Sequence, residues 1–228
     1  MWSKVWDAPG QKPQTKKTAG VNGMDKNKLD PRRCRRKNNA MKLVIIFGLL
    51  ITLTVTGCAT DMLKTPKYTS DYATIDDLKR QNLSKVVIGA VTPKRLNEKV
   101  NNIILRGNPL VSSSKSYAQY LEDALRRDMA DANLLDSKSV VKLSTLLLKN
   151  EIDVSDSNTG YGLMEARFTT FRNGYIEYDK FVSAEIQFES SSSSEVAISN
   201  ARNHYPVLVR ALLNKLYSDE EFIDALHK

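Results

Sequence analysis

Two kinds of hydrophobic spacing follow one another at the start of the folded part of the chain, and they predict a strand and then a helix. Residues 85–92 are a run of β-branched and small residues, which is typical of a strand covered on both faces. After an irregular stretch over 93–115, apolar residues recur at helical spacing over 116–132. Ser116 and Gln119 fit a capping box at the beginning of this helix.

A strand-rich segment comes next. Residues 140–154 and 163–172 carry the β-branched and alternating apolar positions of two strands. Asn173-Gly174 follows directly, and this dipeptide readily takes positive φ at both central positions of a type I′ turn. We therefore expect the strand before it to pair with residues 175–188 as an antiparallel hairpin.

The last long pattern is helical and extends over 197–217, with Pro206 inside it. Proline lacks an amide donor, so we expect a kink or a new helix start at this position. A short amphipathic segment over 219–226 follows. The order of the long elements is β–α–β–β–β–α, which predicts an α+β fold: a two-layer sandwich with one largely antiparallel sheet and two helices.

The stretch before these elements shows no sustained periodicity. Residues 59–83 are mostly polar and include Pro66, a composition that predicts a tether. We expect a flexible tether over 58–83 and a compact domain over 84–228. A domain of about 145 residues can bury an ordinary core without disulfides.

A hydrophobic segment nearer the N-terminus has the layout of a secretory signal over 41–57. Lys42 provides a short positive region, and residues 43–55 form a thirteen-residue apolar run. A membrane-spanning helix needs about 20 apolar residues, so this shorter run favours a cleaved signal peptide over a permanent anchor. If this signal is used, we expect Met41 to be the natural start and residues 1–40 to be a basic leader upstream of it; the alternative is that residues 1–40 are a real part of the protein.

The end of this segment, Val55-Thr56-Gly57-Cys58, resembles the lipobox of bacterial lipoproteins. The resemblance implies that the Cys58 thiol receives a diacylglyceryl group, that cleavage falls between Gly57 and Cys58, and that the new amine is acylated. Two or three acyl chains hold a protein stably on a bilayer, so Cys58 would be an anchor and not a catalyst. A chance cysteine after an uncleaved signal is the alternative. Ala59 stands where Asp favours inner-membrane retention in enteric lipoproteins, which implies the outer membrane and a periplasm-facing domain.

The net charge of +8 is concentrated in the first forty residues. Residues 1–40 contain eleven Lys and Arg against three Asp, whereas the chain from Cys58 onward has 22 basic and 23 acidic residues. Contacts between basic side chains and phosphates supply much of the affinity for nucleic acid. With the basic leader removed, we expect no nucleic-acid partner.

Candidate catalytic chemistry is sparse. His204 and His227 lie in separate segments, and no neighbouring Cys, His or carboxylate residues have metal-ligand spacing. Gly-x-Ser-x-Gly, phosphate-binding-loop and His-Glu-x-x-His motifs are absent from the sequence. We expect neither a metal nor a cofactor, and we predict that the protein is not an enzyme.

The lipobox and the element order together resemble small proteobacterial outer-membrane lipoproteins with a compact periplasmic α+β domain. These include the lipopolysaccharide-assembly partner lipoprotein and the auxiliary lipoproteins of lipid-transport ABC systems. The likeness covers the lipobox residues and, in architecture, residues 84–226. It implies a membrane-anchored, non-enzymatic accessory subunit that binds an envelope protein partner.

Two loops are candidates for the binding surface, Arg106–Pro109 and Ser190–Ser194. Two other functions stay open. A lipid- or glycan-binding envelope module would need a concave apolar pocket between the helices and the sheet. A cytoplasmic nucleic-acid-binding protein would need the basic leader over 1–40 to be retained.

Overall fold

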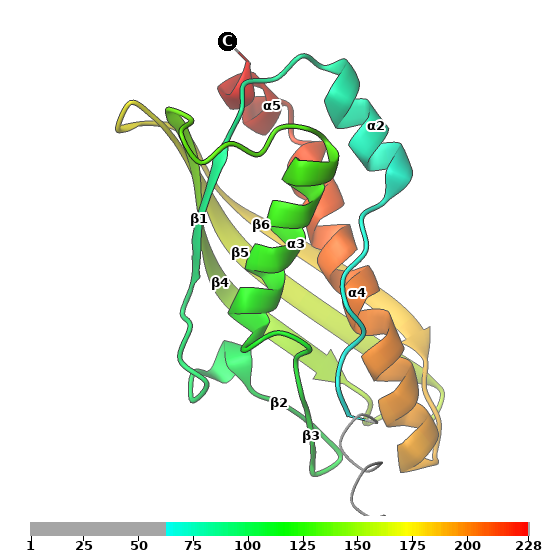
Figure 1. Ribbon diagram of the computed structural model, residues 1–228. Coiled ribbons are helices and arrows are strands. Elements are labelled where there is room, and N and C mark those ends of the chain that lie inside the picture. The colour runs from blue at the N-terminus through cyan, green and yellow to red at the C-terminus, as the bar shows by residue number, and fades with distance from the viewer. Residues whose placement is uncertain (1–62, 228) are drawn as a thin grey trace, which may run out of the picture. The chain divides into compact units, whose positions relative to one another are not determined.

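The computed structural model describes residues 63–227, which belong to one compact unit, Gly57–Lys228. It confirms the predicted α+β class and the β–α–β–β–β–α order of the long elements (Figure 1). The elements in chain order are α2 (Tyr72–Arg80), β1 (Val87–Thr92), a short 3-10 helix η1 (Lys99–Asn101), β2 (Ile103–Leu105), β3 (Asn108–Leu110), α3 (Tyr117–Asp131), β4 (Val141–Asp153), β5 (Thr159–Arg172), β6 (Tyr175–Glu189), α4 (Ser194–Tyr217) and α5 (Glu220–Leu226).

The main sheet has the strand order β1-β4-β5-β6. β4, β5 and β6 follow one another along the chain and pair antiparallel, so most of the sheet is antiparallel, as predicted. β1 instead runs parallel to β4, because α3 crosses over between these two strands. α3 and α4 cover one face of the sheet and make the second layer (Figure 1). β2 and β3 form a separate small antiparallel hairpin.

The turn between β5 and β6 has the geometry that the Asn-Gly dipeptide predicts. Asn173 and Gly174 have φ values of 52° and 87°, the positive angles of a type I′ turn. Arg172 pairs directly with Tyr175 across this turn. The predicted hairpin is therefore confirmed, and its two strands are 14 and 15 residues long.

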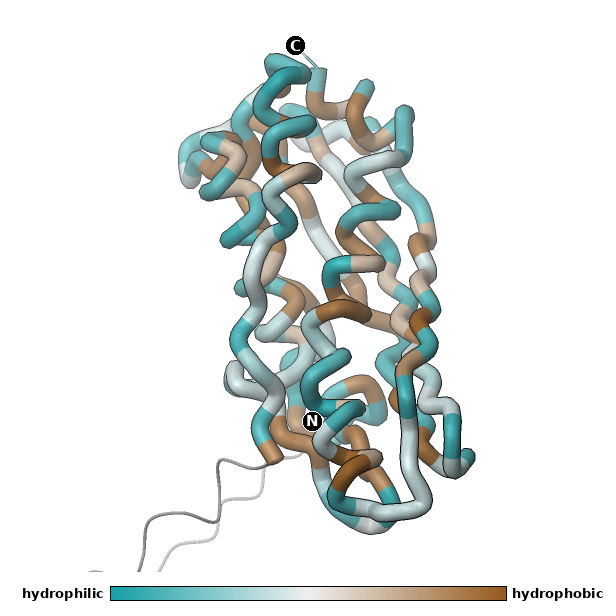
Figure 2. Tube along the Cα trace, turned by 90° about the vertical axis from the view of Figure 1, so that its right-hand side faces the viewer, coloured by the Kyte–Doolittle hydropathy of each residue, from teal (hydrophilic) through white to brown (hydrophobic). Residues whose placement is uncertain are grey.

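The predicted cap of α3 forms in part. The Ser116 hydroxyl oxygen accepts a hydrogen bond from the Gln119 N–H at 3.0 Å. The Gln119 side chain does not reach back to the cap, because its Nε2 donates to Asp123 Oδ1 at 2.9 Å. Apolar and polar positions alternate around α3 and α4 (Figure 2), and the apolar side of each helix faces the sheet.

α4 is a single helix that continues through Pro206, where the sequence also allowed a new helix to start. A proline removes one backbone hydrogen bond from a helix. The burial of one side of α4 offsets this loss. Tyr205 and Leu208 on that side are fully buried. The Tyr205 ring packs against Tyr117 of α3, with ring centroids 4.9 Å apart, and so joins the two helices.

Residues 63–83 are part of the folded domain, which corrects the predicted domain boundary at residue 84. An extended segment before α2 lies over α3 and α4 (Figure 1). The Tyr120 hydroxyl of α3 donates to the Pro66 carbonyl at 2.8 Å, and Arg210 of α4 donates to the Thr69 carbonyl at 3.1 Å.

α2 is also packed onto the domain. Its Ile75 and Leu78 are buried, as are Tyr68 before it and Leu83 after it. These apolar residues are few and widely spaced, so they produce no sustained period in the sequence. Their partners lie in distant helices, and for this reason the local pattern predicts a tether.

Candidate functional site

The lipobox residues Val55, Thr56, Gly57 and Cys58 and the neighbouring Ala59 lie outside the described residues. Their roles in lipidation, cleavage and sorting therefore stay predictions. The described chain begins at Leu63, only five residues after Cys58.

The two loops predicted as binding surfaces meet at one end of the domain. Arg106–Pro109 includes the turn of the β2–β3 hairpin, and Ser190–Ser194 connects β6 to α4. The Arg106 guanidinium joins them, because Nη1 donates to the Ser192 carbonyl at 3.0 Å and Nε donates to the Val154 carbonyl at 2.9 Å. These donors are used within the protein, so Arg106 is a structural link among three loops.

The face of the sheet opposite α3 and α4 carries exposed apolar side chains. An antiparallel sheet with one solvated face usually has polar residues on that face. Here Phe181 is 66% exposed, Ile176 60% and Leu146 38%. The strand register places Leu146, Arg167 and Phe181 in one row across β4, β5 and β6. We call this surface the outer-face patch and define it as Leu146, Arg167, Phe171, Ile176 and Phe181.

Arg167 is held in a fixed orientation within this patch. Its Nε donates to Asp179 Oδ1 at 2.7 Å, and its Nη2 makes a second bond to the same carboxylate. The Thr169 hydroxyl donates to Asp179 Oδ1 at 2.9 Å. The hydrogen bond from Arg167 holds the pKa of Asp179 below its ordinary value, so the pair is ionised at neutral pH.

The guanidinium also contacts the aromatic ring beside it. Arg167 Cζ lies 5.6 Å from the centroid of the Phe181 ring, a cation–π distance. Protein interfaces are enriched in aromatic and arginine side chains, and contiguous exposed apolar patches mark binding surfaces. The outer-face patch therefore has the composition of a protein-binding surface.

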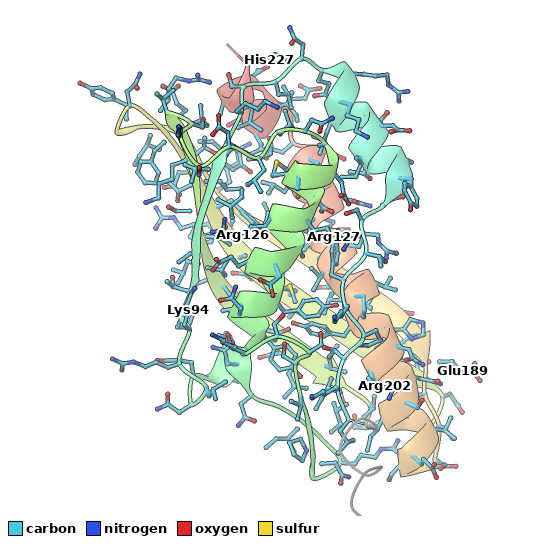
Figure 3. The ribbon with its side chains drawn as sticks, in the orientation of Figure 1. Lys94, Arg126, Arg127, Glu189, Arg202 and His227 are labelled. Carbon is cyan, nitrogen blue, oxygen red and sulfur yellow. The ribbon has the colours of Figure 1, made fainter. Side chains whose placement is uncertain are left out.

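The β1 edge of the sheet is closed by side chains of α3. Arg126 Nη2 donates to the Ile88 carbonyl at 2.8 Å, and the Val91 N–H donates to Glu122 Oε2 at 3.2 Å. Lys94 also pairs with Glu122, at 2.9 Å, and Figure 3 shows Lys94 and Arg126 on the β1 side of α3. A partner strand that paired with the β1 edge would have to break the bonds from Arg126 and Glu122 to the β1 backbone.

Glu122 stays charged in this position. Burial raises its pKa, but hydrogen bonds from Lys94, the Val91 N–H and Arg126 outweigh burial and hold the pKa below its ordinary value. The carboxylate therefore acts as a charged cap on the edge of β1.

The other edge, at β6, is partly covered by α4. Lys215 Nζ donates to the Ser183 carbonyl at 2.8 Å, and Asn200 Nδ2 donates to the Glu189 carbonyl at 2.9 Å. Because side chains engage the backbone of both edge strands, the outer face of the sheet is a better candidate for binding than either edge.

The space between the helices and the sheet is filled by side chains. Tyr117, Phe168 and Tyr205 are all buried there. A hollow of about 810 Å³ lies on the surface beside α3, and its lining includes Lys67, Asp123 and Arg127. This hollow is charged, unlike the apolar pocket that a lipid-binding module requires.

Within residues 63–227, no group of three His, Cys, Asp or Glu side chains is arranged to hold a metal ion. His204 lies inside α4, with Nδ1 2.8 Å from the Asn200 carbonyl oxygen. Its ring stacks on Phe188, with ring centroids 5.0 Å apart. His204 thus takes part in packing between α4 and β6.

No helix in the described part of the chain is long and apolar enough to cross a membrane.

No family model and no curated protein matches this chain. Several solved structures are similar to it in part. Protein XCC0632 from Xanthomonas campestris, a DUF330 protein, is 12% identical with a TM-score of 0.43, and the alignment covers 68% of this chain and 93% of that one. A "putative lipoprotein" from Caulobacter crescentus is 13% identical with a TM-score of 0.37, over 68% of this chain and 96% of that one. The hypothetical protein CT253 from Chlamydia trachomatis is 10% identical with a TM-score of 0.39, over 63% and 99%.

Proposed function

We propose that the mature protein begins at acylated Cys58 and is a membrane-anchored, periplasm-facing lipoprotein that binds a protein partner in the cell envelope. In this proposal it is a non-enzymatic accessory subunit. The outer-face patch carries the proposal, since exposed Phe181 lies beside an oriented Arg167 on a sheet face that neither α3 nor α4 covers. Aromatic and arginine anchors of this kind dominate the energetics of many protein interfaces.

A protein fits this surface better than a lipid or a glycan does. The patch lies on a sheet face and mixes apolar side chains with paired charges, such as Arg167–Asp179 and the Lys149–Glu165 pair at 3.0 Å. Small ligands and lipids are usually bound in concave pockets. The interior position for such a pocket, between helices and sheet, is filled by the side chains described above.

Site-specific photo-crosslinking in the native host tests the binding surface. A photoreactive phenylalanine analogue at Phe181 is compared with the same analogue at Tyr72, which is 87% exposed on α2 and lies off the patch. We expect light-dependent adducts with one envelope protein from position 181 and none from position 72. The same analogue at Ile176 provides a second position on the patch, and absence of adducts from both 181 and 176 would reject the patch. Equal adducts from 181 and 72 would show unspecific contact.

Intact mass spectrometry of the protein purified from host membranes tests the anchor. We expect a species that begins at acylated Cys58, without residues 1–57. An unlipidated chain that retains residues 1–40 would reject both the anchor and the envelope localisation. It would also restore the basic leader as the first segment to test for nucleic-acid binding.

Density-gradient fractionation of the two membranes tests the sorting step. The lipobox resemblance and Ala59 support outer-membrane localisation, and Ala59→Asp is expected to move the protein to the inner membrane. Recovery of the wild-type protein in the inner membrane would reject the outer-membrane assignment and leave the lipid anchor intact.

A further inference from the structure

We propose that one end of the domain lies against the phospholipid bilayer, through a surface that we call the hairpin end and define as Lys64, Ile104, Pro109 and Val111. The inference rests on the proposed acylation of Cys58 and deepens it, because it states which surface of the domain faces the lipid.

The chain is held to the domain from the first described residues onward. Leu63 accepts a hydrogen bond at its carbonyl from the Val111 N–H at 2.9 Å, and the Thr65 N–H donates to the Val111 carbonyl at 2.9 Å. Lys64 thereby forms a parallel bridge with Val111, next to β3. The described part of the chain therefore begins beside the β2–β3 hairpin.

The remaining chain between this point and Cys58 is short. Leu63 stands five positions after Cys58 in the sequence, with four residues between them. An extended chain spans at most about 3.6 Å per residue, so Leu63 lies no more than about 18 Å from the acylated cysteine. A free tether over 58–83 would instead have allowed a reach of roughly 90 Å. Because part of the shorter reach is used within the lipid headgroup layer, the hairpin end is brought to the membrane surface.

The β2–β3 hairpin is amphipathic. Ile103, Leu105 and Leu110 are buried against the core. Ile104 is 59% exposed and pairs with exposed Pro109 across the hairpin, so these two side chains project from the same side. Val111 follows two residues after Pro109 and is 44% exposed.

Basic side chains lie on one side of this apolar surface, whereas Ile104 on its other side shares a hollow with Glu151 and Asp153. Lys64 is exposed, and so are Lys67 and Lys115 along the neighbouring segments. Within residues 63–227, none of these three lysines forms an ion pair with a carboxylate. The carboxylate that lines the same hollow as Lys67 and Lys115 is Asp123, which accepts hydrogen bonds from Ser114 and Gln119. Exposed apolar residues beside unpaired lysines suit an interface with anionic phospholipid headgroups.

The opposite end of the domain provides the reference surface. The β5–β6 turn lies there (Figure 1), and Tyr175 in it is 77% exposed. With the hairpin end on the bilayer, this turn points away from the lipid. Tyr175 and Ile104 are both exposed and apolar, so exposure alone does not distinguish them. Only the residue near Leu63, Ile104, is expected to meet the membrane.

Depth-dependent fluorescence quenching tests the inference on the full chain, expressed and processed in its native host. Ile104→Cys and, as matched control, Tyr175→Cys are each labelled with an environment-sensitive dye. Both positions are exposed, so neither change removes buried packing. The labelled proteins are placed in vesicles of phosphatidylethanolamine and phosphatidylglycerol that carry brominated acyl chains. Intact mass spectrometry of the same samples establishes whether Cys58 is acylated.

We expect a blue shift and a loss of fluorescence at position 104 and neither change at position 175. Acylated protein without quenching at position 104 would overturn the inference and leave the lipoprotein assignment standing. Equal quenching at both positions would also overturn it, because the domain would then lie on its side. A mass without acyl chains would remove the proposed anchor and this inference together.

Discussion

The hydroxyl of Tyr68 donates a hydrogen bond to the buried carboxylate of Asp128 at 2.8 Å and ties the segment before α2 to α3. Tyr217 of α4 donates to the same Asp128 oxygen at 3.2 Å. One carboxylate therefore joins an N-terminal segment and two helices. The joint thereby holds the segment before α2 on the two helices.

Tyr68→Phe removes one of the two tyrosine hydroxyls that bind Asp128. A hydrogen bond to a buried charged group contributes about 2 kcal/mol, so we expect the free energy of unfolding to fall by about that amount. Urea denaturation measures the change. Tyr72→Phe is the control, since Tyr72 is 87% exposed, and equal stabilities of the two variants would contradict the role of the joint.

Asp128→Asn is expected to change how stability depends on pH. Burial raises the pKa of Asp128 above its ordinary value, and hydrogen bonds from Tyr68 and Tyr217 oppose this only in part. The folded chain thus binds this proton more tightly than the unfolded chain. Above its folded-state pKa, Asp128 is ionised and lowers the free energy of unfolding. This destabilisation disappears as the pH falls from the folded-state pKa toward the ordinary pKa of an aspartate, about 3.9.

The measurement is the free energy of unfolding of wild type minus that of Asp128→Asn. We expect this difference to increase as pH is lowered from about 7 to about 4.5. A difference that decreases over this range would mean that the carboxylate stabilises the fold as an anion.

Glu122→Ala leaves the Val91 N–H and Arg126 without their carboxylate at the β1 edge. We expect a loss of about 2–3 kcal/mol at neutral pH, measured by urea denaturation. Hydrogen bonds hold the pKa of Glu122 below its ordinary value, so its contribution is present above that value and is lost as pH falls through the folded-state pKa. The wild type should therefore approach the variant in stability at acid pH.

The control for this change is Glu151→Ala. Glu151 forms an exposed pair with Lys99, and its side chain is 47% exposed. Exposed ion pairs contribute about 0–1 kcal/mol, so a small effect is expected. A Glu122→Ala variant no less stable than Glu151→Ala would show that the edge cap adds little.

Phe181→Ser separates binding from folding. Phe181 is 66% exposed, so we expect the free energy of unfolding to stay within about 0.5 kcal/mol of wild type. Co-purification of the crosslinked partner from membranes should be lost. Phe168→Ala is the contrasting control, since Phe168 is fully buried and its truncation should cost about 3–5 kcal/mol. Full retention of the partner by Phe181→Ser would remove this residue from the interface.

Local signals in the sequence determined the type and order of the long elements. Asn173-Gly174 predicts the β5–β6 turn because both residues tolerate positive φ, a property of the dipeptide itself. Ser116 predicts the start of α3 because its hydroxyl satisfies an N–H only three residues away. The lipobox resemblance at Val55–Cys58 is local too and lies outside the described residues. Such signals are readable because the interacting groups are sequence neighbours.

Only the tertiary structure decided which surfaces are exposed and where the domain begins. Alternation along β5 separates two faces of a strand, but it does not say which face the helices will cover, so the patch around Phe181 could not be predicted. Likewise, Arg106 joins loops that are 86 residues apart in the chain. Tyr68 meets Asp128 sixty residues away, and this contact incorporates a segment whose own pattern predicts a tether. The few apolar residues of this segment are buried by helices that are distant in the sequence. Contacts with distant elements produce no hydrophobic period within the segment itself.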